Sequence, residues 1–261
     1  MKQLLTIFLL LSFAAAQTPA AGPAPTDENG RKARKLIDQA ITALGGPAYL
    51  NIVDMKQQGR SYSFHHGQPT SVGLVYWRFW KFPDKDRVEL TKDRDVVVIH
   101  NGDLGFEVTY KGVAEEERDA LSDYLRRRRY SLEWVLRKWI NEPGVAFFYD
   151  GSAVAEQKPA DQISIVSANN ESVTLFLDST THLPIKKTFS WRDPRDKERN
   201  HEEEAYDSYR QVQGIMTPFS VIRYYNGDMA NQRFLNSIAY NQSIPDSLFA
   251  AAVGSKTAPK H

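Results

Sequence analysis

Two stretches of the chain place hydrophobic residues at helical spacing. The first opens near Asp27, and Gly45-Gly46-Pro47 ends it. The second runs from Ala114 to Ile140, with acidic residues in its first turn and a candidate break at Tyr130-Ser131. The predicted buried stripe of the first helix is Ala33, Leu36, Ile37, Ala40, Ile41 and Leu44. That of the second is Leu121, Leu125, Leu132, Val135, Leu136 and Trp139.

Elsewhere the hydrophobic period is two, which predicts strands. Turn signals such as Asn101-Gly102 and Asn226-Gly227 separate them and favour hairpins. Parallel pairs would need repeated crossover helices, so the sequence predicts an α+β fold with one curved antiparallel sheet of about 11–12 strands. The expected strands are 53–64, 70–80, 86–92, 94–100, 104–111, 145–150, 162–168, 172–177, 183–191, 203–211, 217–225 and 232–241.

Several of these strands are apolar on both faces. Between Val72 and Trp80, one face carries Val72, Leu74, Tyr76 and Trp80, and the other carries Val75, Trp77 and Phe79. An antiparallel sheet normally buries one face and leaves the other in water. Two apolar faces therefore indicate a covering on each side. The sequence leaves open whether the inside is packed solid or encloses an apolar cavity under a helical lid.

The N-terminal residues resemble a cleavable export signal. Lys2 precedes an apolar run over residues 4–16 that ends in small residues, which predicts cleavage after Ala16. We expect the order 1–16 signal peptide, 17–26 flexible linker, 27–249 a single β domain and 250–261 a disordered tail. The predicted location is the periplasm.

Composition narrows the possible functions. The chain has no cysteine and a formal net charge of +1, which argues against thiol chemistry, thiolate metal sites and nucleic-acid binding. It contains no G-x-S-x-G elbow and no glycine-rich phosphate loop. His201 to Glu204 lacks the second histidine of a metalloprotease motif, and we interpret this charged run as solvated surface. We expect no catalytic residue, no metal and no cofactor.

The strongest charge feature is Arg126-Arg127-Arg128-Arg129. Four successive residues cover all sides of a helix, so at least one of them faces inward or marks a helix break. One interpretation is a solvated helix shoulder. The other is contact with an anionic lipid headgroup or an acidic partner, for which the guanidinium fork is well suited.

Short structural motifs are spread over residues 43–249: Ala43–Gly46, Pro83–Arg87, Asn101–Phe106, Tyr149–Gly151, Leu175–Pro184, Tyr206–Arg210, Gly214–Phe219 and Ile244–Phe249. In their order and spacing they resemble the periplasmic lipoprotein-carrier superfamily with the LolA-like fold, most closely its outer-membrane lipoprotein-sorting branch. The resemblance implies a half-open antiparallel barrel with helices plugging its mouth and acyl chains held inside. Family lids are held by a barrel arginine, and Arg60, Arg78, Arg87 and Arg223 are all strand candidates for that role.

The resulting hypothesis is an exported carrier that shields acyl chains of a lipid or lipoprotein in an apolar barrel cavity. The alternative is an envelope regulatory or assembly protein that uses the same sheet to bind a protein partner. That alternative predicts a filled interior and an exposed apolar patch. The predicted lining is Val75, Trp77, Phe79, Val97, Phe106, Leu125, Leu132, Trp139, Leu175 and Tyr225, with the inward parity of each strand left open.

Overall fold

A computed structural model describes residues 27–251, so the expected signal peptide, the linker and most of the tail lie outside the described residues. One antiparallel sheet of 14 strands dominates the fold. Its order is β7-β6-β5-β4-β3-β1-β14-β13-β12-β11-β10-β9-β8, with β2 paired to β1. The strands are β1 (Asp54–His65), β2 (Gln68–Pro69), β3 (Leu74–Lys81), β4 (Lys85–Leu90), β5 (Val96–Asn101), β6 (Leu104–Thr109), β7 (Gly112–Glu115), β8 (Ala146–Ala155), β9 (Lys158–Val166), β10 (Ser172–Asp178), β11 (Pro184–Arg192), β12 (Arg199–Val212), β13 (Ile215–Tyr225) and β14 (Asp228–Tyr240).

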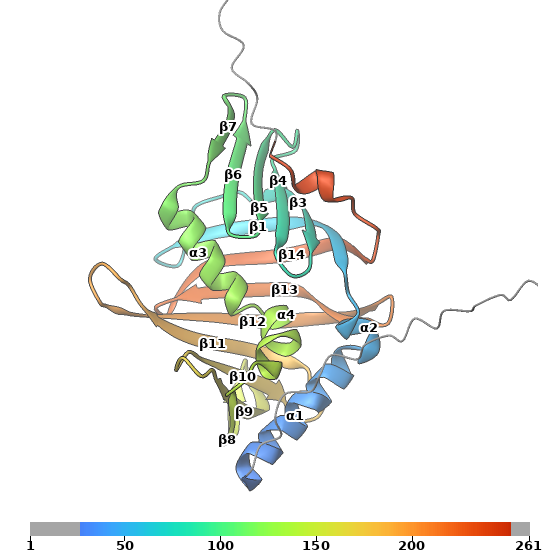
Figure 1. The fold of residues 1–261 in the computed structure, drawn as a ribbon, viewed down its shortest axis with the longest axis vertical. Helices are drawn as coiled ribbons and strands as arrows, with labels where there is room; N and C mark the ends of the chain where they lie inside the picture. The colour runs from blue at the N-terminus through green and yellow to red at the C-terminus, as the bar shows by residue number, and fades with distance from the viewer. Residues whose placement is uncertain (1–26, 252–261) are drawn as a thin grey trace, which may run out of the picture.

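The sheet curves around its helices without closing, since β7 and β8 are its two edges (Figure 1). This confirms the predicted fold class, a half-open antiparallel barrel with an N-terminal helix and a central helical cover. The strand number is higher than the expected 11–12, because the short strands β2 and β7 have too few residues to show alternation.

Helix α1 (Glu28–Leu44) forms as its periodicity predicts. The Asp27 side chain caps it by accepting a hydrogen bond from the Gly30 amide at 2.6 Å. Its predicted apolar stripe is buried, and the helix packs against β8. Gly45 ends it at φ 128°, where a Cβ atom would lie 2.5 Å from the Gly214 carbonyl oxygen. The short helix α2 (Pro47–Leu50) follows.

The long helix expected over 114–140 divides at the predicted break. Helix α3 (Arg118–Arg129) ends at Tyr130, and Ser131 caps α4 (Leu132–Arg137), which continues into the 3₁₀ helix η1 (Trp139–Asn141). The expected start at Ala114 is wrong, because Glu115 ends strand β7 and Glu117 is the N-cap residue of α3. The predicted stripe is buried only from Leu132 onward, since no residue of α3 is buried.

The main core lies on the concave face, between α1, α4 and the strands. Trp139, Leu136, Leu175 and Ile163 are each 0% exposed there. The polypeptide itself therefore fills this part of the interior.

A second, smaller core lies on the convex face of β3 to β6. The C-terminal segment with the 3₁₀ helix η2 (Asp246–Phe249) covers it, and Phe249 packs with Phe79, Val97 and Ile99. Lys81 and Lys85 hold this segment by ion pairs to Asp246 at 2.6 and 2.7 Å. This segment is the second covering that the two-sided apolarity of the strands required.

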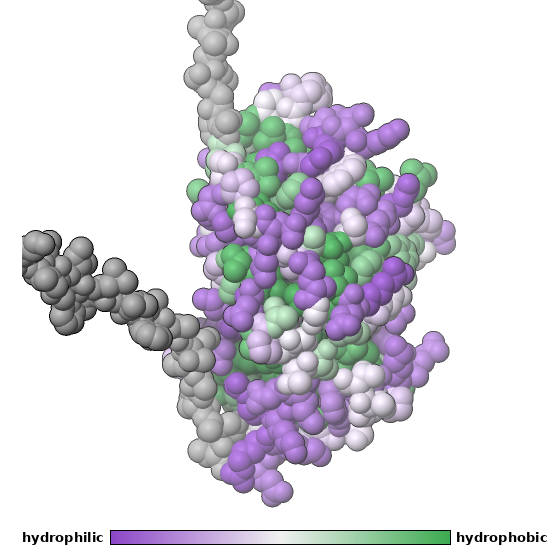
Figure 2. Space-filling model, turned by 90° about the vertical axis from the view of Figure 1, so that its right-hand side faces the viewer, coloured by the Kyte–Doolittle hydropathy of each residue, from purple (hydrophilic) through white to green (hydrophobic). Residues whose placement is uncertain are grey.

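The molecular surface on the right-hand side of Figure 1 is mixed. Apolar residues gather there in several separate areas divided by hydrophilic ones (Figure 2). Within residues 27–251, no helix combines the length and the apolar character needed to cross a membrane.

Candidate functional site

Helix α3 lies across the mouth of the sheet and contacts both of its arms (Figure 1). On the β5–β6 side, the Tyr124 ring stacks on His100 with centroids 3.4 Å apart and planes 3° from parallel. His100 Nε2 lies 2.8 Å from Glu116 Oε2. Arg128 donates to the Gly102 carbonyl oxygen at 2.5 Å and to Asp103 at 2.7 Å. One side of α3 is thus attached by a stacked pair and by polar contacts.

The other side of α3 faces the strands β11 and β12. Arg126 stacks over Trp191, with its guanidinium carbon 3.4 Å from the ring centroid. Its Nη2 donates to Asp123 at 2.5 Å, and its Nε donates to Glu202 at 3.4 Å. Asp119, one turn earlier, accepts from Arg195 at 2.8 Å. Charged contacts therefore dominate on this side as well.

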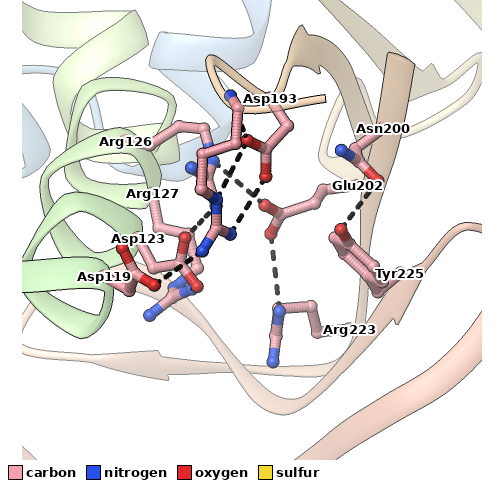
Figure 3. Close-up of polar contacts among 10 residues, drawn as sticks. Asp119, Asp123, Arg126, Arg127, Asp193, Asn200, Glu202, Arg223 and Tyr225 are labelled. Atoms are coloured by element: carbon pink, nitrogen blue, oxygen red, sulfur yellow. Dashed lines mark hydrogen bonds and ion pairs between the residues drawn. The ribbon is translucent and has the colours of Figure 1, made fainter. Parts of the chain in front are cut away.

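A groove opens between α3 and the strands β12 to β14, with a volume of about 270 Å³ (Figure 3). We call it the α3 groove. It is lined by Asp123, Arg126, Arg127, Glu202, Arg223, Tyr225 and Ala230.

The α3 groove is charged rather than apolar. Glu202 is only 1% exposed and lies 3.5 Å from Arg223 and 3.4 Å from Arg126. The Tyr225 hydroxyl donates to Asn200 at 2.7 Å, so this hydroxyl group at the groove already has an acceptor. Burial, followed by the charge of nearby Arg223, lowers the pKa of Arg127.

The four arginines of the predicted headgroup contact have different surroundings. Arg126 and Arg128 dock α3 as described, and Arg129 donates to Glu142 at 2.5 Å and to Glu171 at 2.9 Å. Within the described part of the chain, the one ion pair of Arg127 is with Asp123 at 3.8 Å. The run is therefore largely a docking surface within the molecule, and only Arg127 retains a loosely held guanidinium.

A strip of partly buried aliphatic side chains lies on the concave face of β4 and β5. We call Val88, Leu90, Val96 and Val98 the aliphatic strip. Register places them on the face of His100 and Arg78, because Val88 pairs with Val98 and Leu90 with Val96. None of the four belongs to a packed core cluster of the described residues.

A hollow of about 360 Å³ borders Val96 and the β6–β7 hairpin. Leu121 and Leu125 of α3 are likewise only partly buried. Incompletely covered aliphatic surface thus lies beside a charged helix.

The predicted lining residues do not come together around one cavity. Val75, Trp77, Phe79, Val97 and Phe106 lie on the convex face, the side of the C-terminal segment, so their assignment to the barrel interior is wrong. Leu132, Trp139 and Leu175 are packed in the concave core. Leu125 and Tyr225 lie at α3 and its groove.

The parity error has a physical cause. Both faces of β3 and β5 are apolar because each face is covered. The sequence of these strands therefore does not show which face points into the barrel. The side chains that lie on the concave face are Tyr76 and Trp80 of β3 and the aliphatic strip of β4 and β5.

The run His201 to Glu204 contains the carboxylates that sequence analysis missed. Glu202 is buried in the α3 groove, so the interpretation of the whole run as solvated surface is wrong. Glu204 accepts from Lys187, whose Nζ lies 2.9 Å away, and from the Tyr206 hydroxyl at 2.7 Å. The available signal was the period-two spacing of Glu202, Glu204 and Tyr206, which places all three on one face.

Lys187 joins this network to the helices. It is 1% exposed and donates to the Tyr130 carbonyl oxygen at 2.6 Å, at the junction of α3 and α4. Arg137 of α4 donates to the carbonyl oxygens of Leu50 and Ile52 at 3.0 and 2.7 Å. The junction and α4 are therefore tied to the body of the protein independently of α3.

Among the described residues, no group of three or more histidines, aspartates and glutamates is close enough together to hold a metal ion. His201 lies 3.7 Å from Glu203, whose side chain is 18% exposed and also pairs with Lys186. Of the strand arginines considered for holding a lid, Arg78 pairs with Asp86 at 2.7 Å on the concave face. Arg87 instead donates to the Leu248 carbonyl oxygen on the convex face.

The chain is similar to known proteins in its fold but not in its sequence. No protein-family model matches the chain, and no curated protein matches its sequence. Solved structures do match. A DUF1329 family protein from Desulfovibrio piger aligns with a TM-score of 0.57 and 9% identity, over 85% of this chain and 99% of that one.

Two further structures agree. A domain from Vibrio parahaemolyticus, described as an outer membrane lipoprotein-sorting protein domain, aligns with a TM-score of 0.53 and 10% sequence identity. The alignment covers 85% of this chain and 97% of that one. A LolA superfamily protein from Nitrosomonas europaea aligns with a TM-score of 0.52 and 11% sequence identity, over 84% of this chain and 97% of that one. At these identities the comparisons define the fold alone: the chain has the fold of LolA superfamily and lipoprotein-sorting proteins.

Proposed function

We propose that the protein is an exported carrier that shields acyl chains of a lipid or lipoprotein against the concave face of its sheet, without catalysis. The observation that carries the proposal is the aliphatic strip beside α3. Val88, Leu90, Val96 and Val98 face the hollow of the barrel and lack a packed partner cluster. Folded proteins cover most of their aliphatic surface, so a concave incompletely covered strip favours an apolar guest. Export and a periplasmic location are part of the proposal.

The way α3 is held supports its role as the movable cover. It buries none of its own residues and is attached through ion pairs and stacked rings. The pair between Arg128 and exposed Asp103 contributes about 0–1 kcal/mol. The pair between Arg126 and buried Glu202 costs more to separate, although Glu202 keeps its contact with Arg223. An acyl chain gains about 0.8 kcal/mol for each methylene removed from water, so several methylenes offset the loss of these contacts.

The filled core beneath α1 and α4 favours the second candidate, an envelope regulatory or assembly protein that binds a protein partner. Leu136, Trp139 and Leu175 leave no room for a guest in that half of the sheet. The carrier proposal therefore places the acyl chain under α3 alone.

Native mass spectrometry of the mature protein after gentle purification distinguishes the two candidates. A carrier retains co-purifying lipid, whereas a bare mass together with a captured protein partner supports the regulator. Titration of the purified protein with a fluorescent fatty acid then tests the location of the guest. Val88→Asn with Val98→Asn should weaken binding about tenfold or more, because polar amides would line the strip.

Val72→Asn is the matched control, because this valine is 98% exposed outside the strip. Circular dichroism confirms that each variant is folded. Unchanged binding by the folded double variant contradicts acyl binding at the strip.

A further inference from the structure

The arginines around the α3 groove outnumber its acids. Arg126, Arg127 and Arg223 contribute three guanidinium groups, while Asp123 and Glu202 contribute two carboxylates. We propose that Arg127 and Arg223 form a binding site for the phosphate or carboxylate headgroup of the guest, so that the ligand is an acidic amphiphile. This inference rests on the proposed carrier function and names its ligand class.

The contacts within the groove explain why Arg127 and Arg223, rather than Arg126, remain available to bind an anion. Arg126 is held on three sides, by Trp191, Asp123 and Glu202, at 3.4, 2.5 and 3.4 Å. Arg223 reaches Glu202 only at 3.5 Å, and Arg127 reaches Asp123 only at 3.8 Å. Neither is bidentate, although the guanidinium fork binds oxyanions best in that form.

The two groups also stand close to each other in a sheltered place. The charge of Arg223 follows burial as a cause that lowers the pKa of Arg127, which indicates repulsion between the two cations. The Arg127 side chain is 36% exposed and that of Arg223 is 27% exposed, so both are reachable from the groove. An oxyanion between them would relieve the repulsion and supply the acceptors that both forks lack.

The position of the groove suits a headgroup. Asp123, Arg126 and Arg127 face β12 and β13, whereas Tyr124 and Arg128 on the same helix face β5 and β6. The groove thus lies on the β12–β13 side of α3, whereas the aliphatic strip lies on β4 and β5, on the side of His100 and Tyr124. An amphiphile with its acid at Arg127 and Arg223 would run its chain beneath α3 toward the strip.

Calorimetric titration of the purified mature protein with dihexanoyl phosphatidic acid, dihexanoylglycerol and inorganic phosphate tests the inference. The two lipids share their acyl chains and differ in the phosphate. We expect phosphatidic acid to bind at least about tenfold more tightly than dihexanoylglycerol, since a charge-assisted pair stabilises by more than a neutral one. Arg127→Gln and Arg223→Gln should each remove most of this difference and leave dihexanoylglycerol binding unchanged.

Arg118→Gln is the matched control, because Arg118 is exposed at the start of the same helix and outside the groove. Equal binding of the two lipids, or a phosphatidic acid preference that survives Arg127→Gln and Arg223→Gln, overturns the headgroup site and leaves the carrier intact. Binding of inorganic phosphate that depends on both arginines, with no binding of either lipid, supports the oxyanion site while refuting the carrier. Unchanged thermal unfolding of the variants excludes a folding defect.

Discussion

The two halves of the concave face are covered in opposite ways. Beneath α1 and α4, side chains such as Leu136 and Leu175 are fully buried, and tryptophan and tyrosine rings fill the remaining space. Beneath α3 the cover is charged, and the sheet keeps a groove and a partly exposed aliphatic strip. Helices α3 and α4 nevertheless follow each other directly in the sequence and are divided only at Tyr130-Ser131.

We infer from this difference that one half stabilises the fold and the other gives a guest access to the concave face. Buried aliphatic groups stabilise the fold by an amount that grows with the area removed from water. An ion pair with an exposed partner, such as that between Arg128 of α3 and Asp103, contributes little net free energy, since water replaces it at small cost. We therefore expect the α4 half to contribute most of the stability of the fold and α3 to contribute less.

The largest expected effect comes from truncating one leucine in each half. Leu136→Ala should lower the free energy of unfolding by about 3 kcal/mol, because it empties a fully buried site. Leu125→Ala on α3 should lower it by about 1 kcal/mol or less, because that side chain is only partly buried. Urea denaturation measures both values, and equal losses would refute the division between the halves.

A second effect, no larger than the first, should appear on acidification at the junction between the two halves. Burial raises the pKa of Glu204, but the charges of Lys187 and Arg233 outweigh it and bring the pKa to about 2. The carboxylate therefore contributes full stability above its ordinary pKa of 4.5, and this contribution is lost as the pH falls from there to about 2. The total loss should be about 3 kcal/mol at most.

Urea denaturation between pH 6 and pH 2.5 checks this. Glu204→Gln should flatten that part of the pH profile, whereas Glu156→Gln at an exposed turn should leave it unchanged. A profile of the same steepness in both variants would mean that another group carries the acid sensitivity.

The smallest effect concerns the attachment of α3 to β5. Burial lowers the pKa of His100 and outweighs Glu116 and Asp86, which raise it; Arg78 also lowers it, and Tyr124 stacks on the ring. The neutral ring is therefore favoured with α3 in place. Docking is fully stabilised above the ordinary histidine pKa of 6.5 and weakens as the pH falls below it.

Hydrogen exchange of the α3 amides, corrected for intrinsic rates, should accelerate from pH 7.5 to pH 5, while α4 amides stay protected. Replacement of exposed His66 by Gln serves as the control. Equal acceleration in α4 would show that the two helices open together.

Local patterns predicted much of this fold. The helical spacing from Ala33 to Leu44 and from Leu132 to Trp139 reflects faces buried against the sheet, so periodicity alone located those helices. The Tyr130-Ser131 break was also visible, because Ser131 caps the following helix. The four-residue strand β7 is too short to show alternation, so the predicted start of α3 was misplaced.

The candidate site depends on contacts between distant residues, which local patterns do not carry. Glu202 is buried because Arg126 and Arg223 come to it from 76 and 21 residues away. The convex side of β3 is covered by residues near Phe249, which no alternation within β3 announces. Sequence therefore located the arginine run but did not indicate which arginine stays available.

The pairing of β1 with β14 has a consequence for the order in which the molecule assembles. All other neighbours in the sheet are close in sequence, so the arms β3 to β7 and β8 to β13 consist of local hairpins. Only Met55 with Tyr240 and the pairs that follow join the first strand to the last. A chain delivered from its N-terminus can form each arm as it emerges, but the two arms unite only after nearly the whole polypeptide is available.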